Sequence, residues 1–492
     1  MSTSQTQQTK IVVIGSGFSG ICMGIMLKQA GLDDFIILEK AASLGGTWRE
    51  NIYPGAECDI PSMLYQYSFE QGFPWESKWS GQAQILEYQI ATVNKYALLP
   101  HFVFSQTVES CKYDQQDSKW SLKTQDGNSY SAQHIVSAVG QLHHASIPKL
   151  KGANLFQGPM FHSANWNQSV ELSGKRVAVI GNAASAVQFI PKIAQIVNHL
   201  TIFQRSANWM LPKHNRRYSK LEHWLWAKFP IVAKLPRLLN WLLSEYLLMP
   251  AIAGNRFLRW VLSRQCKNSM RKWVKDPVVL AHLKPRYNLG AKRTLFSHEY
   301  YQALARNNVE LDVSGIETLT ATGVTRKDGR SDDFDVLIYA TGFKTNPFLM
   351  GIEVQGKEVQ GKKQYLHDAW SEGAHAYLGV HTNGFPNLHI MYGPNTNLGH
   401  NSIILMIEAQ ANYILEVIQS LDRNNQHSIE VSEQVEAVYN DELQRRLAQM
   451  SFAEVKNSWY KDGEKITNNW AGSVREYRKR LRRVDWGHYL LH

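Results

Sequence analysis

Cysteine is scarce in this chain, and none of it stands in a functional arrangement. The 492 residues include four cysteines, Cys22, Cys58, Cys111 and Cys266. They lie far apart and form no CxxC pair, which excludes a locally encoded zinc site and a disulfide-reductase type of dithiol centre. Because free cysteines are typical of a reducing compartment, we expect a cytoplasmic protein.

Long apolar segments are also missing. The longest apolar run, residues 238–254, is interrupted by Asn240, Glu245 and Pro250. It is shorter than the ~20 clean apolar residues that a membrane-spanning helix needs. The first ten residues are polar, so no secretory signal is predicted. A chain of this length suits two or three domains of ~100–200 residues.

The formal net charge of +11 is concentrated in one segment. Residues 213–275 hold fourteen Lys and Arg against two Glu, with five Trp among them. Three interpretations compete: a helical subdomain with a solvated basic face, a surface that touches a membrane, and a nucleic-acid surface. No nucleic-acid motif accompanies the segment. We predict a helical subdomain at about 213–285 without nucleic-acid binding, and peripheral membrane contact through 213–275 is the alternative.

The first glycine-rich turn follows a short β-branched run. Residues 10–14 predict a strand, Gly15, Gly17 and Gly20 form a GxGxxG turn, and residues 21–29 predict a helix. In such units the glycines permit a tight turn and a close approach of pyrophosphate to the helix N-terminus. Glu39 ends the next predicted strand, 24 positions after Gly15, where an acid accepts ribose hydroxyls. The segment therefore predicts a site for FAD or NAD.

A second turn of the same kind begins at Gly181. The middle glycine is replaced by Ala183, and Ser185 lies at the start of the helix predicted over 187–197. Arg205 stands 24 positions after Gly181, the offset that Glu39 has from Gly15. An arginine at this corner favours a 2′-phosphate, so the second site is predicted to bind NADPH. A solvated loop arginine is the plain alternative.

Other glycine-rich or charged segments stand between and after these turns. Residues 45–48 combine paired glycines with Thr47 and Trp48, which suits a backbone lying against a flat ring, although a surface loop with a packed Trp fits as well. Lys292 and Arg293 are adjacent cations that follow Gly290, and a charged loop is the alternative. Asn397 and Leu398 belong to a glycine-rich loop before the helix predicted over 403–421, whose N-terminus would stabilise negative charge.

Together these patterns predict an α/β fold with two Rossmann-like dinucleotide-binding domains, the NADPH domain being inserted into the FAD domain. Residues 1–148 would form the first part of the FAD-binding domain. Residues 149–379 would form the NADPH-binding domain with its helical subdomain. Residues 380–492 would complete the FAD-binding domain and add a C-terminal tail.

Between the two turns lies the segment Phe156–Asn167. Phe156, Gly158, His162 and Trp166 match the motif FxGxxxHxxxW, with Asn167 where Pro or Asp is usual. Flanked by two dinucleotide turns, this segment resembles the fingerprint of the type I Baeyer–Villiger monooxygenases, and the resemblance covers nearly the whole chain. Trp166 favours this family over N- and S-oxygenating flavin monooxygenases, which usually carry Tyr or Phe there.

The resemblance implies a reaction and a set of roles. NADPH would reduce FAD, O2 would form a C4a-peroxyflavin, and a ketone would become an ester or lactone, with sulfide oxidation as a side activity. The residues with implied roles are Arg293 over the flavin, Asp59 holding that arginine, Arg205 and Lys292 on the 2′-phosphate, His162 and Trp166 at a hinge, and Trp470 closing the substrate side. The cofactor contacts would involve Gly15, Gly17, Gly20, Glu39, Gly46, Thr47, Trp48, Asp59, Gly181, Ser185, Asn397 and Leu398.

Two alternatives stay open at this level. One is an N- or S-hydroxylating flavin monooxygenase. The other is a membrane-surface flavin-binding module in which Ala183 and Asn167 mark lost catalysis. The ketone and the oligomeric state are not predicted.

Overall fold

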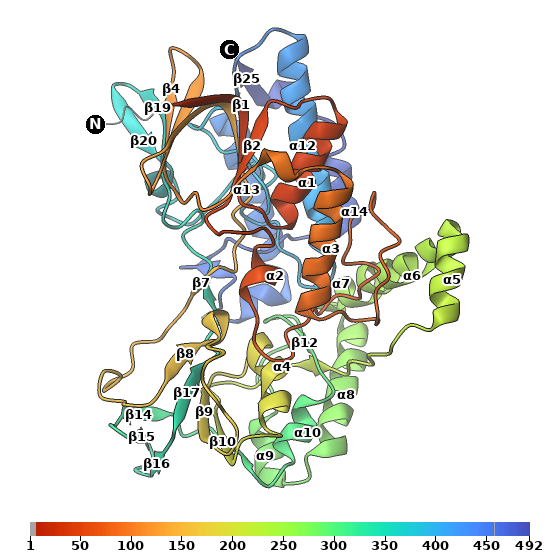
Figure 1. Ribbon diagram of the computed structural model, residues 1–492, viewed down its shortest axis with the longest axis vertical. Coiled ribbons are helices and arrows are strands. Elements are labelled where there is room, and N and C mark those ends of the chain that lie inside the picture. The colour runs from red at the N-terminus through yellow and green to blue at the C-terminus, as the bar shows by residue number, and fades with distance from the viewer. Residues whose placement is uncertain (1–5, 457) are drawn as a thin grey trace.

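The computed structural model describes residues 6–456 and 458–492. Residues 1–5, half of the polar start, and residue 457 lie outside the described residues. Two sheet-based units lie one above the other in Figure 1, and a group of helices extends beside them. The predicted α/β class is confirmed.

The upper unit is built on a parallel sheet. Its central strand is buried from Ile11 to Ile14, as expected for a strand with both faces covered. The order in space is β3 (Phe102–Val103), β2 (Phe35–Leu38), β1 (Gln7–Ile14), β6 (Ser129–Ser137) and β21 (Leu388–Ile390).

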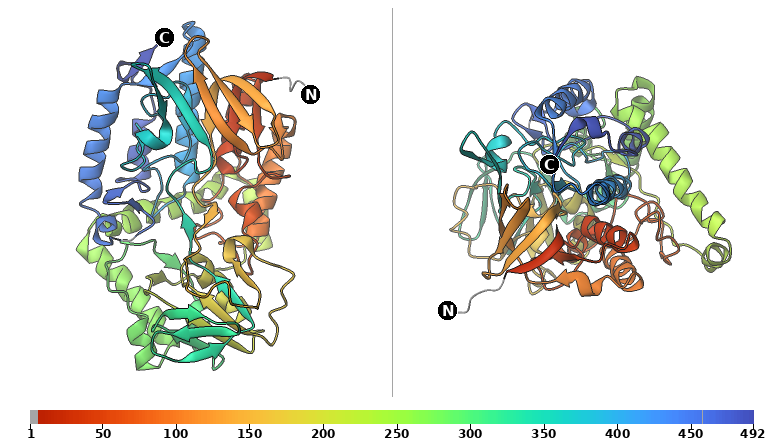
Figure 2. Two further views of the ribbon diagram at one scale, coloured as in Figure 1. Left: turned by 90° about the vertical axis from the view of Figure 1, so that its left-hand side faces the viewer. Right: turned by 90° about the horizontal axis from the view of Figure 1, so that it is seen from above.

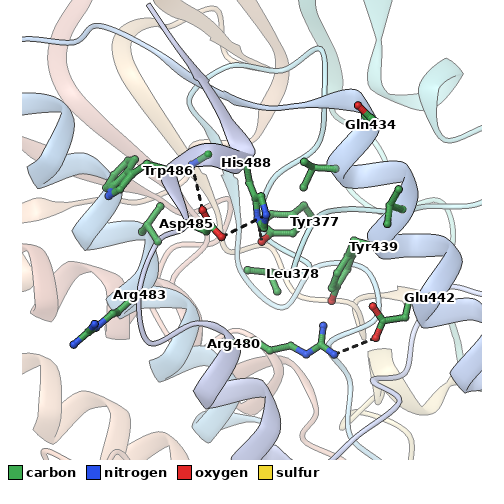
Figure 3. A pocket seen from close by; sticks show the side chains of 14 residues that line it. Tyr377, Leu378, Gln434, Tyr439, Glu442, Arg480, Arg483, Asp485, Trp486 and His488 are labelled. Carbon is green, nitrogen blue, oxygen red and sulfur yellow. Dashed lines mark hydrogen bonds and ion pairs between the residues drawn. The ribbon is translucent and has the colours of Figure 1, made fainter.

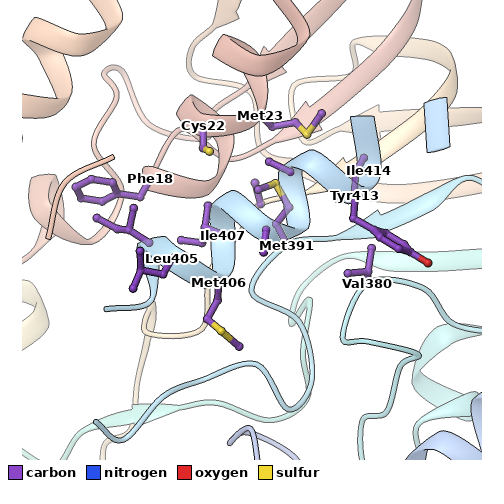
Figure 4. Close-up of a cluster of buried hydrophobic side chains, with 14 of the residues drawn as sticks. Phe18, Cys22, Met23, Val380, Met391, Leu405, Met406, Ile407, Tyr413 and Ile414 are labelled. Atoms are coloured by element: carbon purple, nitrogen blue, oxygen red, sulfur yellow. The ribbon is translucent and has the colours of Figure 1, made fainter. Parts of the chain in front are cut away.

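Two helices from opposite ends of the chain form the core beside this sheet. α1 (Phe18–Gln29) contacts α12 (Ile404–Arg423). In Figure 4, Cys22 and Met23 of α1 lie near Ile407 and Ile414 of α12. The helices predicted over 21–29 and 403–421 therefore exist, with bounds shifted by at most three residues.

The upper sheet continues into an antiparallel layer. β6 belongs to both parts, because residues 129–132 pair with β5 and residues 135–137 pair with β21. Beyond it lie β5 (Lys119–Thr124), β4 (Val108–Asp114), β19 (Glu353–Val359) and β20 (Lys362–Tyr365). The chain is thus already paired with the upper sheet at β19, before the boundary predicted at residue 379. The polar β19–β20 hairpin carries no motif that would have revealed this.

The lower unit holds the second parallel sheet. Its strands, in spatial order, are β13 (Val309–Asp312), β10 (His199–Phe203), β9 (Arg176–Ile180), β17 (Val336–Tyr339) and β8 (Met160–His162). α4 (Ala184–Ile193) packs against α10 (Tyr300–Leu304). A small antiparallel sheet follows, made of β14 (Ile316–Leu319), β15 (Gly323–Arg326) and β16 (Ser331–Asp333).

The chain crosses between the two sheets twice, and the crossings pair with each other. β7 (His144–Ala145) and β18 (Phe343–Lys344) form a short antiparallel ladder. The lower unit is thus entered and left through one two-stranded connection, and the second crossing marks the true return to the upper unit.

The helical subdomain predicted at about 213–285 contains α5 (Lys220–Lys228), α6 (Pro230–Leu243), the π-helix η3 (Ser244–Leu248), α7 (Met249–Ile252), α8 (Arg256–Trp273) and α9 (Pro277–His282). Viewed from above in Figure 2, α6 lies along the outside of the molecule. No helix within the described ranges is long and apolar enough to cross a membrane.

The remaining elements complete the surface and the C-terminal part. They are α2 (Thr47–Glu50), α3 (Gln82–Lys95), α11 (Leu366–Ala369), α13 (Glu433–Leu447), α14 (Val474–Arg480), β11 (Met210–Leu211), β12 (Leu295–Phe296), β22 (Ile429–Val431), β23 (Lys461–Asp462), β24 (Lys465–Ile466) and β25 (Tyr489–Leu491).

A chain of buried imidazoles crosses the upper core. His134 Nδ1 lies 3.2 Å from His389 Nε2, and His389 Nδ1 lies 2.7 Å from His381 Nε2. His381 Nδ1 is 2.8 Å from the Tyr489 hydroxyl of β25. Burial lowers the pKa of His389 to about 3 and holds the pKa of the other two histidines well below the usual value.

The three buried imidazoles predict that acid lowers the stability of the fold. The three imidazoles are neutral when folded, whereas unfolded histidine titrates near ~6.5. Below that pH the unfolded state binds more protons, so the free energy of unfolding should fall as the pH drops from about 6.5 toward 3, by up to ~1.4 kcal/mol per pH unit for each group. Urea unfolding followed by tryptophan fluorescence between pH 7.5 and 5 measures the slope. His389→Gln should flatten it, and His298→Gln, at a half-buried histidine outside this chain of imidazoles, should not; equal slopes in all three proteins would contradict this origin.

Candidate functional site

A cavity of about 650 Å3 lies where the two units meet. Its wall includes Ile14, Leu38 and Ala138, at or just beyond the carboxyl ends of β1, β2 and β6, together with Ala184 and Ser185 from the first turn of α4. The crevice outside the carboxyl ends of parallel strands is where open α/β sheets bind their ligands. The volume lies within the range of small-molecule and cofactor sites.

The first glycine turn forms one end of this cavity. Gly15 has a φ of +107°, and a Cβ there would meet the Ala138 carbonyl oxygen at 2.6 Å, so only glycine fits. Gly17 faces Gly46, whose own Cβ would lie 3.1 Å from the Gly17 Cα. The two backbones therefore come together without side chains, leaving their amides open to a ligand.

Glu39 closes the same end. Its Oε2 accepts from the Ser16 amide at 2.9 Å and from the Ser16 hydroxyl at 2.6 Å, while Oε1 accepts from the Ala41 amide at 2.9 Å. The carboxylate is thus fixed beside the turn. Oε2 already accepts two hydrogen bonds, whereas Oε1 retains a lone pair for a ribose hydroxyl.

The middle of the cavity suits a flat group with a polar edge. Trp48 and Thr47 lie in its wall, and Trp48 Nε1 donates to the Tyr65 hydroxyl at 3.1 Å. Gln141 also lines it, and within the described chain its Oε1 is buried without a hydrogen-bond partner. A buried acceptor left unpaired is costly unless a ligand supplies a donor. These residues fit FAD lying between the glycine turn and Arg293.

Arg293 and Asp59 meet in the cavity wall. Arg293 Nη2 lies 3.4 Å from Asp59 Oδ2. Burial alone would lower the pKa of Arg293, but Asp59 and the smaller effects of Tyr460, Cys58 and Tyr392 together outweigh it, so the pKa is raised. The guanidinium is a fixed cation, held by a carboxylate from the other unit.

A second cation, Lys213, reaches the same carboxylate. Its Nζ lies 2.8 Å from Glu57 Oε1 and 3.9 Å from Asp59 Oδ1, and the side chain is 2% exposed. Burial raises the pKa of Glu57 against the opposing pull of Lys213. In the sequence, Lys213 is recognisable only as one of fourteen basic residues of its segment. Its ion pairs form only when the helical subdomain folds back onto the cavity.

The second turn places its cations together outside the main cavity. Lys292 Nζ donates to the Ser206 hydroxyl at 2.9 Å, next to Arg205 at the end of β10. Burial, and then the charge of Arg205, lowers the pKa of Lys292. Gly181 has a φ of +104° at this turn. Two cations at the corner of a dinucleotide turn fit the 2′-phosphate of NADPH.

The C-terminal loop meets the helical subdomain at the cavity. Asn397, Leu398 and Asn401 line it just before α12. Asn401 Nδ2 donates to Glu245 Oε1 of η3 at 2.7 Å, and the His400 Nε2 lies 3.5 Å from the same oxygen. Glu245 was counted from the sequence only as a break in an apolar run, yet it connects the loop to the subdomain.

A second, more open groove lies near the C-terminus (Figure 3). The Tyr377 hydroxyl lies 2.7 Å from His488 Nδ1, and Arg480 donates to Glu442 at 3.3 Å. Its polar groups are largely paired with one another. None of the site residues predicted from the sequence is among those that line it.

Comparison with known proteins identifies the family. Residues 12–234 match the family described as pyridine nucleotide-disulphide oxidoreductase. A Baeyer–Villiger monooxygenase of Pseudomonas aeruginosa is 38% identical over 504 residues, covering 100% of this chain and 94% of that one. The chain belongs to the type I Baeyer–Villiger monooxygenases. A second relative with this name, from Streptomyces coelicolor, is 35% identical over 98% of this chain and 92% of its own length.

Solved structures of monooxygenases share the architecture. An oxidized steroid monooxygenase bound to NADP superposes with a TM-score of 0.88 at 27% identity, over 99% of both chains. The four cysteines here are all buried and free, so the disulphide chemistry in the matched description has no counterpart among them.

In this monooxygenase the fingerprint lies in the lower unit and not in the cavity wall. Phe156 is buried beside Gly158, and a Cβ on Gly158 would clash with the Phe156 ring at 2.7 Å. His162 ends β8 with its ring 6.1 Å from Phe343 of β18. Trp166 packs against Phe189 of α4. His162 thus touches the crossing strand between the units, where a coupling role would act.

Trp470 is buried away from the cavity wall. It is 2% exposed and packs among Arg446, Arg480 and Tyr477. It is not among the described residues that line the cavity. Its backbone amide donates to the Asn397 carbonyl oxygen and its indole donates to the Ser473 carbonyl oxygen. The role of Trp470 on the substrate side stays a prediction.

Lys213 is expected to stabilise the monooxygenase. Lys213→Met leaves Glu57 and Asp59 with less compensation, so we expect a loss of about 1–3 kcal/mol in the free energy of unfolding. Lys192→Met removes an exposed partner of Glu299 and should cost less than about 1 kcal/mol. Urea titrations of both variants measure the free energy of unfolding. Equal losses would show that the ion pairs of Lys213 stabilise the protein no more than an exposed pair does.

Proposed function

We propose that the protein is an FAD- and NADPH-dependent monooxygenase that uses O2 to convert ketones to esters or lactones. The observation that carries the proposal is the Asp59–Arg293 pair, set in the wall of the cavity that the Gly15 turn also lines. When bound, FAD would supply oxygen activation and NADPH the electrons. The protein's own residues bind, orient and shield the reactants.

The first site would hold the adenosine end of FAD. The amides of the Gly15 turn would bind the pyrophosphate, and Glu39 would accept from a ribose hydroxyl. Trp48 and Thr47, which line the cavity, would pack against the ring system. The binding energy is thus spread along an elongated ligand, which suits a cofactor that stays bound.

Arg293 is the residue that we assign to the chemistry. It keeps its proton at any working pH and is 38% exposed, so it can face a reactant in the cavity. Asp59 fixes its position. A preorganised cation stabilises negative charge that develops on oxygen more strongly in the transition state than in the ground state.

The cavity wall also keeps water away from that charge. Much of it is apolar, with Phe296, Leu243, Phe348 and Ile407 among the lining residues. Excluding water strengthens the field of Arg293 and limits stray proton transfer that would waste reduced cofactor. An apolar wall also favours a ketone with a hydrocarbon body over a charged substrate.

Arg205 and Lys292 are proposed to select NADPH. Both cations lie at the second turn, and Ser185 starts the helix that faces the cavity. A 2′-phosphate would receive charge-assisted hydrogen bonds from both, which NADH could not accept.

The first experiment tests Arg293. Enzyme with FAD, NADPH and O2 is incubated with linear, cyclic and aryl ketones and a thioether, and mass spectrometry detects the addition of one oxygen atom. The wild type should form esters or lactones. In Arg293→Ala, NADPH should still reduce the flavin, seen as loss of flavin absorbance. The rate of ester formation should fall at least ~100-fold. Ester formation at wild-type rate in Arg293→Ala would refute the assignment, and Arg217→Ala is the matched surface control.

Nucleotide preference tests Arg205. Removing a charge-assisted contact of about 1.5–3 kcal/mol should raise the KM for NADPH by roughly 10- to 100-fold in Arg205→Ala. The KM for NADH should change less than about twofold, since no phosphate contact is lost. Initial rates with both nucleotides measure the ratio, and an equal rise for both would count against a 2′-phosphate contact.

A further inference from the structure

Helix α6 turns apolar side chains toward solvent and Arg237 toward the protein, the reverse of an ordinary surface helix. Arg237 points inward, where Nη1 donates to the carbonyl oxygens of Met63, Leu64 and Gln66 at 2.9–3.4 Å. Ala233 is buried on the same helix. The helix is thus anchored to the protein by hydrogen bonds from Arg237.

The outer side of α6 is apolar. Ile231 is 82% exposed, and the other large exposed side chains of the helix are Val232, Leu235, Leu238, Leu239 and Leu243. We call these six residues the α6 outer face. The solvated basic face predicted for this segment is therefore wrong at α6. Monomeric proteins rarely leave so continuous an apolar surface uncovered, and such surfaces mark interaction sites.

Basic and aromatic groups border the α6 outer face. Lys228 lies over the ring of Trp224, 4.9 Å from its centroid, and Trp224 is itself exposed. Within the described residues, neither Lys228 nor Lys234 has a carboxylate within 4.0 Å. Glu222, the acidic residue of α5, is paired with Arg216. The rim of the face is therefore positive.

We propose that α5 and α6 dock on the surface of an anionic lipid bilayer. The α6 outer face would enter the boundary of the acyl chains, Trp224 would lie at the headgroup level, and Lys228 and Lys234 would face lipid phosphates. The two helices project at the right of Figure 1 and lie on the outside of the molecule in Figure 2. A flat membrane surface could therefore reach them.

Charge favours lipid over a second copy of the chain. A two-fold dimer would place the same patch against itself, bringing the lysines of one rim toward those of the other. Like charges brought together at an interface oppose association. An anionic bilayer complements both the positive rim and the apolar face. Its headgroups would neutralise the lysines, and its interior would bury the apolar side chains.

The docking face also reaches the proposed catalytic cavity. Leu243 is 55% exposed on the α6 outer face and also lines the cavity, together with Asn240 and Ser244. Resting on the proposed function, this continuity means that a ketone dissolved in the bilayer would meet the cavity rim at the membrane surface. The bilayer would then be both the docking partner and the reservoir of apolar substrate.

Vesicle sedimentation tests the docking without any turnover. FAD-loaded enzyme is spun with vesicles of phosphatidylcholine alone, or with a quarter of phosphatidylglycerol, at low and high salt. We expect at least ~10-fold more bound protein on the anionic vesicles, falling several-fold at high salt. Ile231→Asp/Leu235→Asp should reduce binding at least ~10-fold and leave turnover of a soluble ketone unchanged. The matched control Leu99→Asp/Ile196→Asp changes two exposed residues elsewhere and should bind as wild type.

Two outcomes would overturn the proposal. One is equal, negligible sedimentation with both kinds of vesicle. The other is a wild-type dimer in analytical ultracentrifugation that Ile231→Asp/Leu235→Asp converts to a monomer while vesicle binding is absent, which would assign the face to a second copy. Because neither readout needs ketone oxidation, these failures would leave the proposed reaction standing.

Discussion

The Asp59 carboxylate is the charge around which the two halves of the enzyme are assembled. It comes from a loop of the upper unit and is 7% exposed, with Arg293 on one side and Lys213 on the other. A buried carboxylate without such partners would be costly or would take up a proton. Lys213 stands at the start of the helical subdomain, and Arg293 follows its last helix. One charge cluster therefore fixes the cavity, the subdomain and the lower unit relative to one another.

The two dinucleotide turns share a pattern but differ in what surrounds them. At the first turn Gly17 faces Gly46 so closely that a methyl group on Gly46 would press on the Gly17 Cα. At the second turn the corresponding residue, Ala183, is exposed. Its methyl group is tolerated because no backbone closes over it. The first site encloses its ligand between two chain segments, whereas the second stays open on one side, which suits a bound cofactor and an exchanging cosubstrate.

How much could be predicted depended on how local each interaction is. The turn at Gly15, the acid at Glu39 and the cation at Arg205 are each encoded within a single βαβ unit, and the structure contains these units. The structural roles of Lys213 and Glu245 depend on partners more than a hundred positions away in the sequence. No periodicity or motif records such pairings, because they arise when the subdomain folds back onto the cavity.

Besides Lys213, charged side chains hold the helical subdomain at two further places along its length. Arg237 binds the carbonyl oxygens of residues 63–66, next to Tyr65 in the cavity wall, and Glu245 binds the loop that carries Asn401. Apolar contacts alone would let α6 slide along its neighbours, whereas a directed hydrogen bond at each place sets one register. Since both places adjoin loops of the cavity, a shift of α6 at the surface would have to move both loops together.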